Sequence, residues 1–303
     1  MNFEKRSSVK HDFSCLYNCS DPRPYFSTLR PLDFRIHRYA IPVFDRCIAM
    51  LRRLRNTPRI DIADLCTGYG VNAALLCHAV SLDHLYELYD ESASQVSTDQ
   101  GAIIDRDRRY FASRRRKGSS IRSFVGIDSA ARAIRYAKDT GLLDEGFCTN
   151  LEREDASPAL RNRVKKISMI TLTGGMGYIG PNTLEKILDV SDRRSRPWIV
   201  AFPLVTTPLG PFERLFENFG LRTEIWKWES FPQRRFADDE ELRRAIISAR
   251  KTGLPEPSPG AYLQTRLVCA RPHAEADAVP LEKIVNAPKR AVSHGTLQIS
   301  ALT

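Results

Sequence analysis

Two acidic residues and a turn of small residues are the clearest candidates for ligand chemistry in this chain. Asp64 ends an apolar run, and Gly68 and Gly70 follow it closely. The segment GYGVNA, which starts at Gly68, satisfies the G-x-G-x-x-G/A pattern of dinucleotide-binding turns, where a glycine backbone approaches the ligand. That pattern also needs an acidic residue about 20 positions further on to hold the ribose. The nearest candidate that ends a second apolar run is Asp128, well beyond that spacing.

The charge of Asp64 favours a different ligand. A carboxylate beside the turn repels a pyrophosphate and suits a ligand that carries an amino or sulfonium group. S-adenosylmethionine (SAM) has both groups and no phosphate. The segment DLCTGYG, Asp64 to Gly70, resembles the first motif of class I SAM-dependent methyltransferases, in which an acidic residue ends the first strand and a glycine-rich turn follows. Cys66 stands where that family usually has its first glycine.

The resemblance implies a set of SAM-binding residues. Gly68 and Gly70 would let the backbone approach the methionine and ribose parts, and Asp128 would accept hydrogen bonds from the ribose hydroxyls. Asn150, after the third strand, would border the adenine. The residues expected to bind SAM are Asp64, Cys66, Gly68, Tyr69, Gly70, Asp128, Ser129, Asn150, Thr173 and Gly174.

The segment TLTGGMGYIG, residues 171–180, is expected to carry the chemistry. Family members that methylate amines of nucleic acids or proteins have an Asn/Asp-Pro-Pro-aromatic signature at this point, and this chain lacks it. Catechol-type members hold magnesium there with acids, whereas this chain has Thr171 and Thr173, so we expect no metal. Tyr178 and Asn150 are the candidate catalytic residues, with Tyr178 offering a cation–π or hydroxyl contact to the sulfonium. A tyrosine that merely packs on its loop explains the residue equally well.

Four reactions or roles stay open for such a protein. The first is transfer of the methyl group from SAM to a small acceptor. The wider spelling also resembles a bacterial natural-product branch similar to azetidine-2-carboxylate synthases, in which the amine of SAM attacks its own γ-carbon and expels methylthioadenosine. A SAM-binding protein without catalysis and an RNA methyltransferase are weaker alternatives.

Residues 1–56 are expected to form a helical lid that precedes the SAM-binding domain. From Ile41 the segment has an amphipathic pattern with apolar residues on one face. Aromatic residues ahead of and within it are candidates to cover the ligand: Tyr25, Phe26, Phe34 and Tyr39. The SAM-binding domain is expected over residues 57–272, and residues 273–303 form a tail without an assigned structure.

Within residues 57–272, seven apolar runs alternate with helical patterns, which predicts a mostly parallel sheet with helices on both faces. The resemblance implies a Rossmann-like sheet with strand seven antiparallel. The predicted strands span residues 60–65, 123–128, 145–152, 166–174, 198–205, 221–228 and 262–270. The predicted helices span residues 70–80, 82–89, 129–143, 181–190, 211–220 and 238–253.

Composition limits the remaining classes. The chain has 303 residues, 42% of them hydrophobic, and no apolar run near the roughly 18 residues of a membrane span. Without a secretory signal pattern, it is expected to be cytoplasmic and to keep its seven scattered cysteines reduced. The net charge of +10 lies largely in the basic segment Arg106 to Arg122, predicted here as a solvated loop. We therefore expect a small-molecule substrate, with nucleic acid unlikely and the oligomeric state open.

Overall fold

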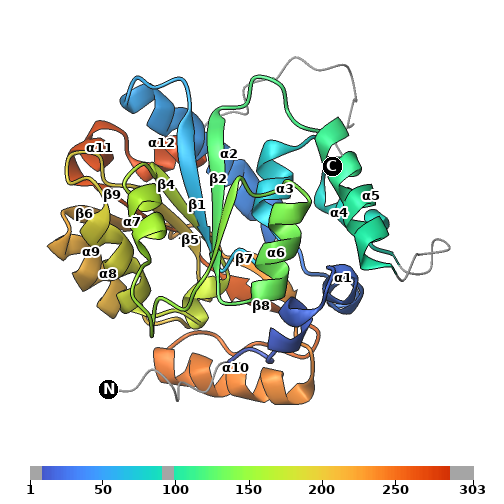
Figure 1. The fold of residues 1–303 in the computed structure, drawn as a ribbon. Helices are drawn as coiled ribbons and strands as arrows, with labels where there is room; N and C mark the ends of the chain where they lie inside the picture. The colour runs from blue at the N-terminus through green and yellow to red at the C-terminus, as the bar shows by residue number, and fades with distance from the viewer. Residues whose placement is uncertain (1–8, 91–98, 287–303) are drawn as a thin grey trace, which may run out of the picture.

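The computed structural model describes residues 9–90 and 99–286 (Figure 1). The first eight residues of the predicted lid and residues 287–303 of the predicted tail lie outside the described residues. In the part of the chain that is described, no helix is long and apolar enough to cross a bilayer.

A seven-stranded sheet forms the centre of the structure, in the order β3-β2-β1-β4-β5-β9-β6. Neighbouring strands are parallel from β3 to β5, and β9 is antiparallel to both β5 and β6. This confirms the predicted Rossmann-like sheet with an antiparallel seventh strand. The strands are β1 (Ile60–Leu65), β2 (Ile121–Asp128), β3 (Glu145–Cys148), β4 (Met169–Thr173), β5 (Trp198–Phe202), β6 (Leu221–Ile225) and β9 (Val268–Pro272).

Helices cover both faces of the sheet, so the central strands are apolar on both sides. Successive residues of a strand point to opposite faces, and Ile62 and Ala63 of β1 belong to two separate apolar clusters. One face packs against α7 (Pro158–Val164), α8 (Pro181–Val190) and α9 (Gly210–Asn218). The other packs against α2 (Ile36–Leu54), α3 (Val71–Cys77), α6 (Ala131–Asp139) and α12 (Leu281–Val285).

Helix α2 shows how the amphipathic pattern places a segment. Its predicted apolar face, which includes Val43, Phe44 and Cys47, is buried against the sheet layer. The helix begins earlier than predicted, at Ile36. It follows the short helix α1 (Arg23–Leu29) and a 3₁₀ turn (Ser14–Asn18).

The prediction of a loop over residues 106–122 is wrong for its first half. Helix α5 (Gln100–Ser113) contains the first arginines, and Asp99 caps it by accepting a hydrogen bond from the Gly101 amide. Ile103, Asp107 and Phe111 recur every four residues and are buried, which gives one inward face despite the charge. Helix α4 (Leu82–Leu88) precedes it.

The prediction of one strand over residues 262–270 is also wrong. The segment divides into β8 (Tyr262–Thr265), which pairs with β7 (Phe231–Arg235), and β9 of the main sheet. Helix α10 (Asp239–Thr252) lies between β7 and β8 in the sequence. We call residues 231–265 the cap. Figure 1 shows α10 across the lower edge of the sheet, beside the N-terminal segment. In the predicted tail, α11 (His273–Ala278) precedes α12.

Candidate functional site

A cavity of about 330 Å³ lies at the carboxyl ends of the central strands. This edge of a doubly covered α/β sheet is where such folds bind ligands. The cavity brings together predicted residues from four strand ends, and Phe34 of the predicted lid also lines it. The predicted residues in its wall are Cys66, Asp128, Ser129, Asn150, Thr173, Gly174 and Tyr178.

Asp128, the last residue of β2, links two backbone turns at the cavity wall. Its Oδ2 accepts a hydrogen bond of 2.8 Å from the Gly68 amide, and its Oδ1 accepts one of 2.9 Å from the Ala130 amide. Each carboxylate oxygen keeps a second lone pair for a ligand. The Gly68 amide already donates to the Asp128 carboxylate, so it is not available to a phosphate, and the negative charge of Asp128 would repel one.

Asp64 lies beneath the cavity rather than in its wall, and its side chain is buried. Its Oδ1 accepts hydrogen bonds from Asn72 Nδ2 at 2.8 Å and from Thr171 Oγ1 at 2.6 Å. Burial raises the pKa of Asp64 to about 6, although these donors act in the opposite direction. The carboxyl therefore titrates close to neutral pH.

Asn72 connects this carboxyl to the cavity wall and to helix α2. Its Nδ2 also donates to Thr173 Oγ1 at 2.9 Å, which leaves the Thr173 hydroxyl hydrogen available to a ligand. The Oδ1 of Asn72 faces His37 Nδ1 at 2.9 Å, so Nδ1 carries the proton. Burial lowers the pKa of His37 to about 4, and the imidazole is neutral at pH 7.

Cys66 occupies the glycine position of the motif in a left-handed conformation, with φ of 55°. A non-glycine residue there is strained. Its side chain fills space that Gly175 leaves open, because a Cβ on Gly175 would lie 2.8 Å from both the Cβ and the Sγ of Cys66. Burial raises the pKa of the Cys66 thiol, which keeps it protonated.

The remaining residues of the glycine turn do not line the cavity. Gly68 has φ of 52°, and the ring of Tyr17 lies so close that a Cβ on Gly68 would be 2.8 Å from Tyr17 Cε1. Gly70 has φ of 79° and is the N-cap residue that precedes α3. Tyr69 is buried, and its hydroxyl donates to the Leu16 carbonyl at 2.6 Å. Tyr69 thus holds the N-terminal segment to the turn.

Residues 9–19, which we call the N-terminal strap, form much of the cavity wall and were not predicted as site residues. The His11 amide donates to Glu241 Oε1 at 2.6 Å, and Lys10 Nζ donates to the Gly174 carbonyl at 2.9 Å. At the far end, Arg132 Nη1 donates to the Asn18 carbonyl at 3.0 Å. The strap residues in the wall are Lys10, Asp12, Phe13, Ser14, Tyr17 and Asn18.

The cap adds Gln233 and Arg234 to the wall. Arg234 is buried and forms two hydrogen bonds with the Glu241 carboxylate, at 2.6 and 2.7 Å. No local pattern marked Gln233 or Arg234 as site residues, because polar and charged side chains are usually exposed and a buried Arg needs a partner such as Glu241. Pro232 also weakens the strand pattern of β7.

Three aromatic residues of the predicted lid do not line the cavity. The ring of Tyr25 lies 5.9 Å from that of Tyr69, and Phe26 stacks on Tyr89 at 4.7 Å. Tyr39 packs against Phe231 of the cap at 5.8 Å. Tyr25 thus packs beside Tyr69 and Tyr39 packs beside the cap, whereas Phe26 packs on the residue that follows α4.

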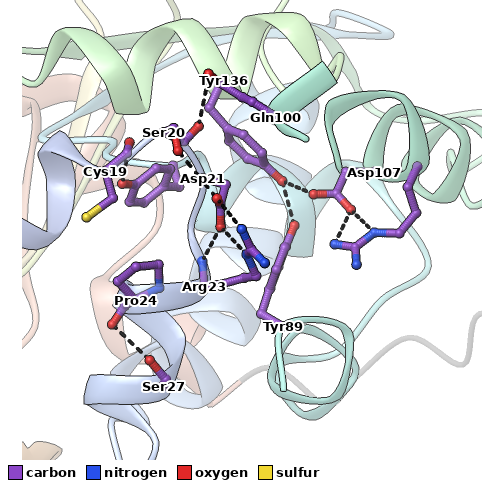
Figure 2. A network of polar contacts seen from close by, with 12 residues as sticks. Cys19, Ser20, Asp21, Arg23, Pro24, Ser27, Tyr89, Gln100, Asp107 and Tyr136 are labelled. Carbon is purple, nitrogen blue, oxygen red and sulfur yellow. Dashed lines mark hydrogen bonds and ion pairs between the residues drawn. The ribbon is translucent and has the colours of Figure 1, made fainter. Parts of the chain in front are cut away.

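Figure 2 shows how side chains of helix α5 contact Tyr136 of α6, Tyr89 and Ser20. The Tyr136 hydroxyl donates to Asp107 Oδ2 at 2.7 Å and lies 2.6 Å from the Tyr89 hydroxyl. Arg106 Nε donates to Asp107 Oδ1 at 2.7 Å, and Gln100 Nε2 donates to the Ser20 carbonyl at 3.3 Å. The inserted helix is therefore joined to both α6 and the segment after the strap.

Many basic side chains of residues 106–122 have partners within the protein. Arg108 forms an ion pair with Asp105. Arg116 donates hydrogen bonds to the backbone carbonyls of His78 and Leu75. These arginines fix the helix and its connections, which weakens the case for a free phosphate-binding face. Within residues 9–90 and 99–286, no three His, Cys, Asp or Glu side chains gather as a metal site requires.

No family model matches the chain, and no curated protein matches it. Three solved structures with a similar backbone are methyltransferases. The plantazolicin methyltransferase BamL, in complex with a triazolic desmethylPZN analog and SAH, has 12% identity and a TM-score of 0.40, with 85% of this chain and 94% of that chain covered.

The magnesium protoporphyrin IX methyltransferase of Synechocystis with bound SAM has 10% identity and a TM-score of 0.36, with 75% and 77% covered. The precorrin-6y C5,15-methyltransferase of Geobacter metallireducens has 11% identity and a TM-score of 0.35, with 75% and 86% covered. These likenesses are distant and concern the course of the backbone alone.

Proposed function

We propose that this chain is a SAM-dependent enzyme that transfers the methyl group to a small acceptor. The observation that carries the proposal is Asp128 at the tip of β2. Its carboxylate lies in the cavity wall. Each oxygen accepts a hydrogen bond from one backbone amide and keeps a lone pair for a hydroxyl donor. A ribose offers two such hydroxyls.

The other residues of the wall fit the rest of the ligand. Asn150 lies two residues after β3, and its Oδ1 accepts the Glu152 amide, so its Nδ2 is left for a base. A buried acid below the turn, Asp64, favours a cationic ligand over a phosphate. The cavity of about 330 Å³ is at the lower end of the range for small-molecule sites, roughly 300 to 1,000 Å³.

When bound, SAM would supply a methyl group on a sulfonium, ready for direct displacement. The chain's own contribution is then position and exclusion of water. Phe13, Leu29 and Phe34 give apolar walls, and the Thr173 hydroxyl is oriented by Asn72. Tyr178 stands in the wall yet has 57% of its surface exposed, which suits a residue that meets the acceptor at the opening.

Cyclisation of SAM is the second candidate, and the strap over the strand ends favours it. Six residues of the strap line the cavity over the strand ends. A reaction within one bound molecule needs no second substrate and gains from a closed, dry site.

One incubation separates the two candidates. The purified protein is mixed with SAM alone and the products are identified. Under the first candidate, SAM persists until an acceptor is added and S-adenosylhomocysteine then accumulates. Under the second, methylthioadenosine forms without any acceptor. A protein that binds neither SAM nor S-adenosylhomocysteine in calorimetry would contradict both candidates.

A further inference from the structure

Three polar groups meet at the β4 end of the cavity, on the side away from Asp128. Lys10 Nζ donates to the Gly174 carbonyl at 2.9 Å and lies 5.7 Å from the ring centre of Tyr178. Gly174 has φ of 78°, and a Cβ there would lie 2.5 Å from Gln233 Nε2 and 3.3 Å from Lys10 Nζ. The lysine of the strap and the glutamine of the cap therefore converge on one glycine.

Both side chains lack a partner that their chemistry calls for. Among the described residues, Lys10 forms no ion pair with an acid, whereas its neighbour Arg234 is paired with Glu241. The Gln233 side chain is 2% exposed, and its Oε1 has no hydrogen-bond partner within the described residues. A buried carbonyl without a donor is costly unless a ligand supplies one.

The two groups complement an α-amino acid. An ammonium at Lys10 attracts a carboxylate, and the amide oxygen of Gln233 accepts hydrogen bonds from an ammonium. Strands β2, β1 and β4 are neighbours in that order. At about 4.8 Å per strand, the ends of β2 and β4 lie roughly 10 Å apart, with the turn after β1 between them.

We propose that Lys10 and Gln233 bind the amino acid end of SAM, Lys10 through the carboxylate and Gln233 Oε1 through the ammonium. The inference rests on the proposed function and extends it, since it places the strap and the cap in contact with the ligand. In this arrangement the ribose lies at Asp128 and the methionine chain crosses Cys66 to reach Lys10.

Binding of a carboxylate to Lys10 has a consequence for protons. Burial and the positive charge of Arg234 lower the pKa of Lys10 to about 7, while Glu241 and Cys66 act in the opposite direction. Tyr178 and Asp12 also stand in the cavity wall near the strap. An anion beside Lys10 raises its pKa, so binding at pH 8 takes up a proton.

Calorimetric titration with three ligands tests the proposal on the full chain. The ligands are SAM, decarboxylated SAM, which keeps the ammonium, and methylthioadenosine, which lacks the amino acid. We expect Lys10→Met to lower the affinity for SAM roughly 10- to 100-fold and to leave the affinities for both other ligands unchanged. We expect Gln233→Leu to lower the affinities for SAM and for decarboxylated SAM roughly 5-fold and to leave the affinity for methylthioadenosine unchanged.

Two further variants control the experiment. Lys10→Arg keeps the charge, so it should bind SAM without the extra proton uptake measured in buffers of different ionisation enthalpy. This comparison also cancels the titration of the amino group of SAM itself, which lies near pH 8. Lys117→Met removes an exposed cation outside the cavity wall and should behave like the wild type.

The possible failures are distinct. Equal SAM affinity in the wild type and Lys10→Met, or an equal loss for methylthioadenosine, would overturn the inference while leaving SAM binding in place. A wild-type chain that binds neither SAM nor methylthioadenosine would overturn the proposed function and the inference with it.

Discussion

The strand-end residues Asp64, Cys66 and Asp128, which we call the floor, and the strap above them are held in different ways. On the floor, the Asp128 carboxylate binds two backbone amides, and Asp64 is bonded within the buried sheet layer. The strap is joined to the rest of the chain by separate contacts, of which the bond between His11 Nδ1 and Asp238 Oδ2 is exposed to solvent. The floor is thus part of the folded core, whereas we expect the exposed end of the strap around His11 to contribute less to the stability of the sheet.

The comparison predicts the largest effect on ligand binding at Asp128. Asp128→Ala removes the acceptor of two amides and the proposed ribose contact, so we expect SAM affinity to fall at least roughly 100-fold, about 3 kcal/mol. Asp128→Asn should have an intermediate SAM affinity, because the one oxygen of its side-chain amide can still accept hydrogen bonds. Calorimetry gives the affinities, with Asp139→Ala, an exposed acid on α6, as the control. Unchanged affinity in Asp128→Ala would show that the ligand is placed elsewhere.

A second floor prediction concerns the contact between Cys66 and Gly175. Gly175→Ala places a methyl group 2.8 Å from Cys66 Sγ, so we expect a loss of about 2 kcal/mol in the free energy of unfolding. A glycine at position 66 adopts the φ of 55° without strain, so Cys66→Gly by itself should cost little. In the double variant, Cys66→Gly with Gly175→Ala, it should restore most of the lost stability. Urea unfolding of the four proteins measures the coupling. Additive losses would mean that the two residues do not contact each other.

The third prediction is a pH dependence carried by Asp64. Its pKa is about 6 in the folded chain and near 4 when unfolded, so the folded state holds an extra proton between these values. The stabilisation is complete below pH 4 and is lost as the pH rises through 6, with about 2 kcal/mol lost between pH 4.5 and 7.5. Asp64→Asn should lack this loss. Urea unfolding at pH 4.5 and 7.5 measures it, and identical pH dependence in both proteins would contradict the assignment.

The smallest effect on stability is expected at His11, at the exposed end of the strap. The His11 and Asp238 side chains are each about two-fifths exposed, and such a contact contributes less than about 1 kcal/mol. His11→Ala should leave the melting temperature nearly unchanged and should speed the dissociation of SAM, because the His11 amide still binds Glu241. Stopped-flow release and calorimetry check this. A loss of stability as large as that of Gly175→Ala would place the strap in the core as well.

The sheet and most of its helices were predictable from local patterns. Helix α8 begins at Pro181 as predicted, where the missing amide hydrogen costs nothing. Helix α10 begins after Asp238, whose side chain caps it, and ends at Gly253 with φ of 67°. Helix α5 was missed because its arginines hide a sparse apolar face, and β7 was missed because a proline and two arginines obscure its period.

The sequence by itself determined the chemistry of the strand ends. The acid before the glycine turn and the acid that ends the next strand were visible as Asp64 and Asp128, because motifs at strand ends depend on neighbours in the chain. Tertiary structure decided that Asp64 lies below the cavity while Asp128 lies in its wall. It also brought Lys10 and Gln233, 223 positions apart in the numbering, to one glycine. Such contacts depend on how the strap and the cap fold back over the sheet, and no local pattern of residues records that.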